Sequence, residues 1–201
     1  MPDQPRPPAV ASPMLAALRD GTRDHHTAVE RRLGLPDRIR TRDDLAAALA
    51  TLLAAWGPLE RELAAADWSG LPLDPRVGEA AALLRSDLAA LGVAVDRPAA
   101  GSSGLDLATT ARAVGGRYVL LGSALGGRVV APEVERRLGL RAGEATGFFR
   151  RVGGTPGRDW RAFRLAVGGR EWSVVEVTAA VDAARSTFDL VGRVEVARPS
   201  G

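Results

Sequence analysis

His25 and His26 are adjacent and are the only histidines of this 201-residue chain, which has no cysteine. A transition metal bound through nitrogen or sulfur therefore has almost all of its candidate ligands at this one place. His26 and Glu30 are four residues apart, so they lie one turn apart on the same face of a helix. A carboxylate in that position can hold the second ring nitrogen of a metal-bound imidazole. The same spacing also fits an ordinary His–Glu pair on a solvated helix face.

A second stretch with unusual chemistry runs from Gly116 to Arg128 and contains Gly122, Gly126 and Gly127. Each glycine inside a helix costs roughly 1 kcal/mol relative to alanine, so its presence calls for a reason. One reason is that a helix surface without side chains lets a flat ligand approach the backbone. The other is that it lets a second helix pack closely, and the sequence leaves both open.

The composition predicts the kind of fold that must position these residues. Hydrophobic residues make up 46% of the chain but aromatic residues only 4%, and the abundant alanine and leucine favour helices. No internal repeat is visible. We expect an all-α, single-domain multi-helical bundle over residues 14–198, preceded by a proline-rich, disordered leader over residues 1–13. The four tryptophans are expected to pack in the core rather than to form a binding platform.

Charge and hydropathy exclude some classes of partner. The formal net charge is only +3, and no run of basic residues interleaved with aromatics occurs, so we expect no nucleic-acid partner. No apolar run approaches the ~20 residues that span a bilayer, so we expect no membrane insertion. The absence of cysteine fits a reducing compartment, and a cytoplasmic location is predicted.

Hydrophobic periodicity and capping residues place the expected helices. Gly57 and Pro58 should kink the second one, and loops are expected at 93–104 and 153–157. The expected helices span residues 14–33, 41–66, 74–92, 106–130, 132–138, 143–152, 158–167 and 173–196.

Taken together, the two stretches resemble haem oxygenases, in particular the bacterial, biliverdin-producing branch associated with bacteriophytochromes. The four-residue repeat is similar to the proximal helix of that family. The glycine-rich stretch, from Arg117 onward, is similar to its kinked distal helix. Residues 83–92 and the pair Thr187–Phe188 add to the resemblance, which covers residues 15–191. The repeat that carries the proximal likeness consists of Leu18, Thr22, His26 and Glu30.

This resemblance implies an activity: cleavage of haem to biliverdin, carbon monoxide and ferrous iron with dioxygen and external electrons. Haem is then both cofactor and substrate. By the same resemblance, His26 is the axial ligand of the haem iron and Glu30 its hydrogen-bonding partner. The backbone of Gly122, Gly126 and Gly127, with Ser123 beside the first of them, would form the opposite, catalytic face.

The resemblance also implies residues that bind the rest of the haem. Tyr118 belongs to the helix that covers the macrocycle. Arg19, Arg161 and Arg164 are expected to pair with the propionates, because a guanidinium binds a carboxylate through two parallel hydrogen bonds. An electron-donor protein, a ferredoxin or a flavin reductase, is implied because the chain has no flavin or nicotinamide motif. We expect a monomer or a weak dimer.

Three positions depart from the family pattern. Ser123 stands where animal members have an aspartate, Leu121 where bacterial members often have a glutamate, and Gly115 where animal members have a tyrosine. A hydroxyl can anchor water but cannot carry a negative charge. Two alternatives therefore stay open: a non-catalytic haem-binding or haem-trafficking protein, and a haem-free helical module that binds a partner protein.

Overall fold

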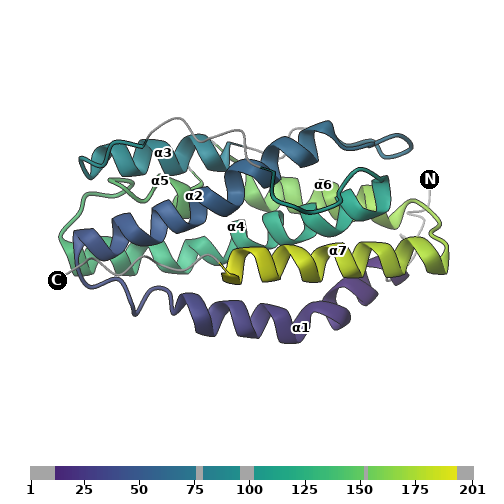
Figure 1. Ribbon diagram of the computed structural model, residues 1–201, viewed down its shortest axis with the longest axis horizontal. Coiled ribbons are helices and arrows are strands. Elements are labelled where there is room, and N and C mark those ends of the chain that lie inside the picture. The colour runs from purple at the N-terminus through teal and green to yellow at the C-terminus, as the bar shows by residue number, and fades with distance from the viewer. Residues whose placement is uncertain (1–11, 76–78, 96–101, 152–153, 194–201) are drawn as a thin grey trace, which may run out of the picture.

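The computed structural model describes residues 12–75, 79–95, 102–151 and 154–193. All regular secondary structure within these ranges is helical, which confirms the predicted all-α fold (Figure 1). None of the described helices is both long and apolar enough to cross a membrane. In chain order the helices are α1 (Pro13–Leu33), α2 (Arg42–Ala65), α3 (Ala80–Ala90), α4 (Thr110–Leu138), α5 (Gly147–Arg150), α6 (Pro156–Gly168) and α7 (Val174–Arg193).

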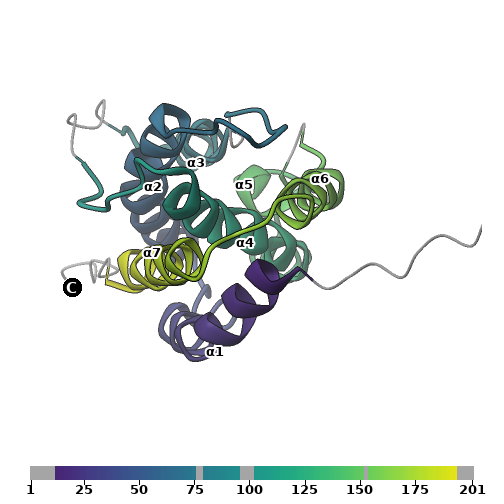
Figure 2. The ribbon, with the colours of Figure 1, turned by 90° about the vertical axis from the view of Figure 1, so that its right-hand side faces the viewer.

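Helix α4 is the central helix of the bundle (Figure 2). Helices α1 and α7 lie on one side of it, α2 and α3 on another, and α5 and α6 on a third. A Cβ atom on Gly115 of α4 would lie 2.1 Å from the carbonyl oxygen of Ala180 in α7. Only glycine therefore allows the two helices to come this close. Gly115, one of the expected departures from the family pattern, therefore serves helix packing in this chain.

Helix α1 is attached to the bundle mainly through α7. A Cβ atom on Gly21 would lie 2.7 Å from Cγ1 of Val181, so glycine is needed at this contact as well. The guanidinium of Arg185 in α7 donates a 2.8 Å hydrogen bond to the carbonyl oxygen of Gly21. These contacts hold the helix that carries His26 in a defined position.

The first two helices begin and end close to the predicted residues. Gly34 ends α1 in the left-handed conformation with φ at 59°, and its amide donates to the carbonyl of Glu30. Thr41 begins α2 through a capping box, in which its hydroxyl accepts from the amide of Asp44 and the Asp44 carboxylate accepts from the amide of Thr41. Pro58 lies within α2 and does not end it.

The prediction of two helices between residues 106 and 138 was wrong, because α4 is continuous and passes through Pro132. Ala131 and Val134, which flank Pro132 in the helix, are completely buried. Their burial against the core outweighs the hydrogen bond that proline removes. The helix also begins at Thr110 rather than at 106, because the Thr109 hydroxyl caps it by accepting from the amide of Arg112.

Helix α3 begins at Ala80 rather than at 74, and its cap comes from a distant part of the chain. The Glu60 carboxylate of α2 accepts from the amides of Ala80 and Ala81 at 2.6 and 3.0 Å. Helix α6 begins two residues earlier than predicted, at Pro156. The predicted leader, apart from Ser12 and Pro13, and residues 194–198 lie outside the described residues.

Candidate functional site

A cavity of about 540 Å³ lies between α1 and α4 and reaches toward α2, α5, α6 and α7. This volume is within the range of sites for small molecules and cofactors. Its wall is mostly apolar, and His26, Glu30, Tyr118 and Ser123 supply most of the polar groups. Both stretches that the sequence indicates, one with His26 and one with Gly122, Gly126 and Gly127, line this cavity.

His26 projects from α1 with one ring nitrogen turned to its expected partner. Its Nδ1 lies 3.4 Å from a carboxylate oxygen of Glu30, and its ring meets the edge of Phe188 in α7 with 5.7 Å between centroids. Nε2 is therefore the nitrogen left for a ligand. The side chain is 57% exposed in the absence of any ligand. His25 points elsewhere, and its Nε2 lies 3.9 Å from the carboxylate of Asp189.

The three glycines of α4 that line the cavity have different surroundings. A Cβ atom on Gly122 or Gly126 would meet nothing within 4 Å, so both positions leave bare backbone facing open space. A Cβ atom on Gly127 would lie 2.5 Å from the carbonyl oxygen of Phe149 in α5. Gly127 thus lets α5 pack against α4, whereas Gly122 and Gly126 keep part of the cavity free of side chains.

Two hydroxyl groups line the cavity, and both are engaged within the protein. Ser123 Oγ donates a 2.8 Å hydrogen bond to the carbonyl of Leu120, which leaves its oxygen as an acceptor. Burial raises the pKa of Tyr118, while a hydrogen bond with Thr22 of α1 lowers it. Leu121 is buried and does not line the cavity. Among the residues that line it, Glu30 is the only one with an acidic side chain.

Aromatic side chains form much of the wall. As expected, all four tryptophans pack in the core or against it, and two of them also face the cavity. Trp56 of α2 and Trp160 of α6 line the cavity, although Trp56 is only 1% exposed. Tyr118 lies 5.6 Å from Trp160 between ring centroids. No spacing rule indicates these residues, because they converge from different helices. The six aromatic residues of the wall are Trp56, Tyr118, Phe148, Phe149, Trp160 and Phe188.

Two buried carboxylates hold the short helix α5, which supplies Phe148 and Phe149. Asp87 of α3 accepts from the amides of Gly147 and Phe148, both at 2.8 Å. Its burial raises its pKa, although the two amides oppose this effect. Glu135 of α4 accepts from Arg150 Nε at 2.6 Å, and this bond is the main cause of a pKa lowered to about 2. The aromatic wall is therefore tied to both α3 and α4.

The arginines that the resemblance assigns to the propionates lie outside the lining of the cavity. Arg19 is exposed, and its Nε donates to the carboxylate of Asp20 at 3.1 Å. It is close enough to Tyr118 for its charge to lower the pKa of that phenol. Arg161 and Arg164 are exposed on α6, the helix that carries Trp160. Their predicted role stays a prediction.

Comparison with protein-family models finds no match for the chain, and comparison with curated proteins also finds none. The resemblance to haem oxygenases therefore stays a prediction, which rests on particular residues rather than on a family match. These residues are the four-residue repeat of α1 and the glycine-rich face of α4.

Proposed function

We propose that this protein is a haem oxygenase, which cleaves haem oxidatively to biliverdin, carbon monoxide and ferrous iron. One observation carries the proposal: His26 and the bare backbone at Gly122 and Gly126 line the same aromatic-walled cavity. A flat macrocycle fits such a cavity, because it needs one axial ligand, apolar walls and a close, side-chain-free surface.

In this proposal Nε2 of His26 would hold the haem iron, because Nδ1 faces Glu30. Glu30, 3.4 Å from Nδ1, holds the imidazole in one orientation and increases its basicity. Phe188 packs edge-on against the same ring and limits its rotation. Bound haem supplies the redox-active iron and is itself the carbon framework that is cleaved.

The residues on the α4 side act by shape more than by acid–base chemistry. Gly122 and Gly126 let a ligand reach the helix backbone, and the aromatic wall excludes water from the macrocycle. The Ser123 hydroxyl donates its hydrogen bond to the Leu120 carbonyl, so its oxygen can accept one from a water molecule. Protons then come from solvent through such a water, rather than from an acidic side chain on this helix.

The Ser123 hydroxyl also supports a second candidate function, that of a protein that binds haem but does not cleave it. Ser123 cannot supply a negative charge, and Leu121 is buried away from the cavity. Both functions predict haem binding, and they differ only in product formation.

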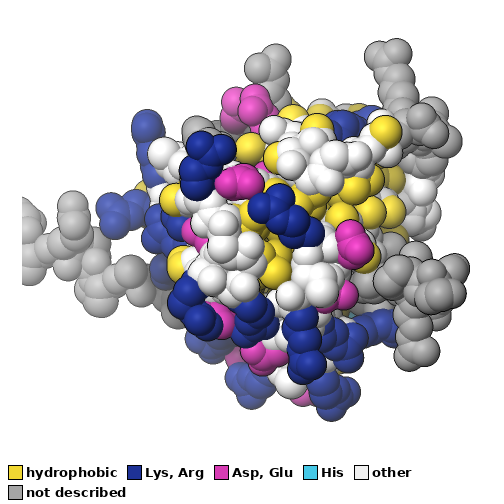
Figure 3. All heavy atoms as spheres, turned by 90° about the vertical axis from the view of Figure 1, so that its left-hand side faces the viewer, with side chains coloured by type: hydrophobic (Ala, Val, Ile, Leu, Met, Phe, Trp, Pro, Cys, Tyr) yellow, Lys and Arg dark blue, Asp and Glu magenta, His cyan; other side chains and the backbone are white. Residues whose placement is uncertain are grey.

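Electrons would have to come from another protein, and we propose a ferredoxin or a flavin reductase acting in the cytoplasm. At the end of the molecule where α1 finishes and α2 begins, arginine side chains outnumber acidic ones around a hydrophobic patch (Figure 3). Positive potential attracts acidic redox proteins and speeds their association. The rate of reduction of the haem-loaded protein should then fall steeply as ionic strength rises.

The decisive experiment for activity is aerobic turnover of the haemin-loaded protein with ascorbate or a reductase system. A haem oxygenase converts the Soret absorption into that of biliverdin and releases one carbon monoxide per haem. Stable haem binding without either product would select the non-catalytic candidate. Absence of haem binding would reject both candidates.

A further inference from the structure

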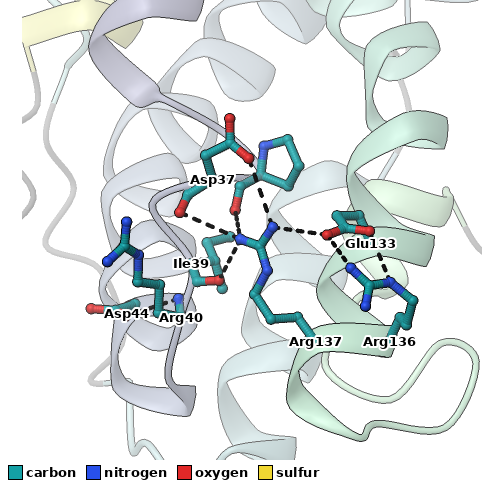
Figure 4. Close-up of polar contacts among 8 residues, drawn as sticks. Asp37, Ile39, Arg40, Asp44, Glu133, Arg136 and Arg137 are labelled. Carbon is teal, nitrogen blue, oxygen red and sulfur yellow. Dashed lines mark hydrogen bonds and ion pairs between the residues drawn. The ribbon is translucent and has the colours of Figure 1, made fainter.

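The connection between α1 and α2 forms one wall of the cavity, and a side chain of α4 is hydrogen-bonded to its backbone. Leu35 and Pro36 of this connection line the cavity, as do Val129 and Val130 of α4. Arg137 lies two turns beyond these valines in the same helix. Its guanidinium reaches the backbone of the connection, as Figure 4 shows.

Arg137 makes an unusually complete set of contacts for a residue near a helix end. Its Nη1 donates to the carbonyl oxygens of Pro36 at 3.0 Å, Ile39 at 3.2 Å and Asp37 at 3.4 Å. Its Nη2 donates to the Glu133 carboxylate at 2.8 Å and lies 3.7 Å from the Asp37 carboxylate. We call this set of contacts the Arg137 clasp.

The connection is also anchored by Ile39, which is 1% exposed and packs in the core. Gly34 and Asp44 fix its two ends to α1 and α2, respectively, since the amide of Gly34 bonds to α1 and Asp44 accepts from Arg40 and Thr41. Neither of these bonds reaches α4. The clasp joins the α1–α2 connection to the helix on the opposite side of the site.

We propose that Arg137 is a positioning residue, which sets how tightly the cavity retains a flat ligand by holding Leu35 and Pro36 against the α4 side. The inference rests on the proposed haem binding for its ligand, but the clasp itself can be tested without it. Loss of the clasp should let the wall move outward and release the ligand faster, while the axial bond from His26 stays the same.

A matched control stands next to Arg137 in the sequence. Arg136 pairs with the same carboxylate, through Nε at 3.1 Å and Nη2 at 2.6 Å from Glu133, and its side chain is 71% exposed. Arg136→Gln therefore removes a charge and a bond to Glu133 without touching the connection. Arg137→Gln removes the same charge together with the clasp.

The test measures amide hydrogen exchange and haemin release in both variants. The amides of Arg38 and Ile39 bond to carbonyls within the connection. Because hydrogen bonds from a charged donor are stronger than neutral ones, Arg137→Gln should speed both exchange at these amides and haemin transfer to apomyoglobin by roughly tenfold or more. The Soret maximum should not shift, and Arg136→Gln should match the wild type. Equal rates in all three proteins, or faster exchange without faster release, would overturn the proposal.

Two further measurements keep the test decisive. If Arg137→Gln does not fold, Arg137→Lys retains the charge beside Glu133 but cannot reach three carbonyls at once, and an intermediate acceleration is expected. If the wild type does not bind haemin, the proposed function fails, and dissociation of the dye anilinonaphthalene sulfonate from the cavity replaces haemin release. Dye release at the wild-type rate in the clasp variants would then overturn the inference.

Discussion

Gly126 and Gly127 are neighbours in α4, yet a Cβ atom would meet nothing within 4 Å on the first and would lie 2.5 Å from the Phe149 carbonyl oxygen on the second. Helix packing explains Gly127 but leaves Gly126 unexplained. An exposed helical glycine costs about 1 kcal/mol relative to alanine, so the open space at Gly126 is kept at the expense of stability. A ligand that needs this space accounts for it.

This difference predicts opposite effects of two alanine substitutions. Gly126→Ala should stabilise the ligand-free protein by up to about 1 kcal/mol and weaken haemin binding, because the methyl group enters the cavity. Gly127→Ala should destabilise the protein by about 1–3 kcal/mol, because α5 must move away. Thermal unfolding and haemin titration of both variants measure the two effects. A Gly126→Ala protein with unchanged haemin affinity would show that the glycine does not serve a ligand.

The Glu30 carboxylate is predicted to act through His26 rather than on the ligand directly. Loss of a hydrogen-bonding partner of a metal-bound imidazole typically lowers metal affinity about 10–100-fold. Glu30→Ala should therefore weaken haemin binding by this order while leaving the unfolding temperature nearly unchanged, since the side chain is exposed. Asp24→Ala, an exposed carboxylate on the same helix, is the matched control and should bind haemin like the wild type.

The pKa of Glu135 predicts a specific loss of stability in acid. Its pKa is lowered from 4.5 to about 2, mainly by the hydrogen bond from Arg150. A carboxylate with a lowered pKa contributes stability that is complete above pH 4.5 and is lost as the pH falls toward 2. The contribution is on the order of 3 kcal/mol at neutral pH.

Glu135→Gln should remove the stability that the Glu135 carboxylate contributes. The free energy of unfolding should then depend less on pH between 4.5 and about 2. Asp20→Asn, which breaks an exposed ion pair with Arg19, should leave the free energy of unfolding nearly unchanged, because solvent screens this pair. Denaturant unfolding at several pH values measures both variants. If the free energy of unfolding of Glu135→Gln falls in acid as steeply as that of the wild type, Glu135 is not the source of the acid-dependent stability.

Asp87 is predicted to hold the aromatic wall in place through its bonds to the amides of Gly147 and Phe148. Asp87→Ala leaves these buried amides without an acceptor, at a cost of about 1–3 kcal/mol for each. Near-ultraviolet circular dichroism, which reports on aromatic packing, should change along with a lower unfolding temperature. An unchanged spectrum would show that other contacts hold α5.

The sequence predicts the parts of this architecture that local rules control. The end of α1 and the start of α2 lie within one residue of the predicted positions, because Gly34 and the capping box at Thr41 act through neighbouring residues. The predicted pairing of His26 with Glu30 is also local, because the two residues lie one turn apart in the same helix.

The rest of the site depends on contacts between distant segments. Glu60 caps α3 from twenty residues away, and core burial carries α4 through Pro132, so neither helix boundary follows from local preference. Trp56 and Trp160 reach the cavity from separate helices. The different roles of Gly126 and Gly127 become visible only when the position of α5 is known.

The most direct test of the central claim compares the two adjacent histidines as haem ligands. Haemin is titrated into the wild type, His25→Ala and His26→Ala, and the Soret band and the electron paramagnetic resonance spectrum are recorded for each. His25→Ala should retain the wild-type spectra, whereas His26→Ala should lose the imidazole-ligated signal and bind haemin at least about tenfold more weakly. Wild-type spectra and affinity in His26→Ala would contradict the account.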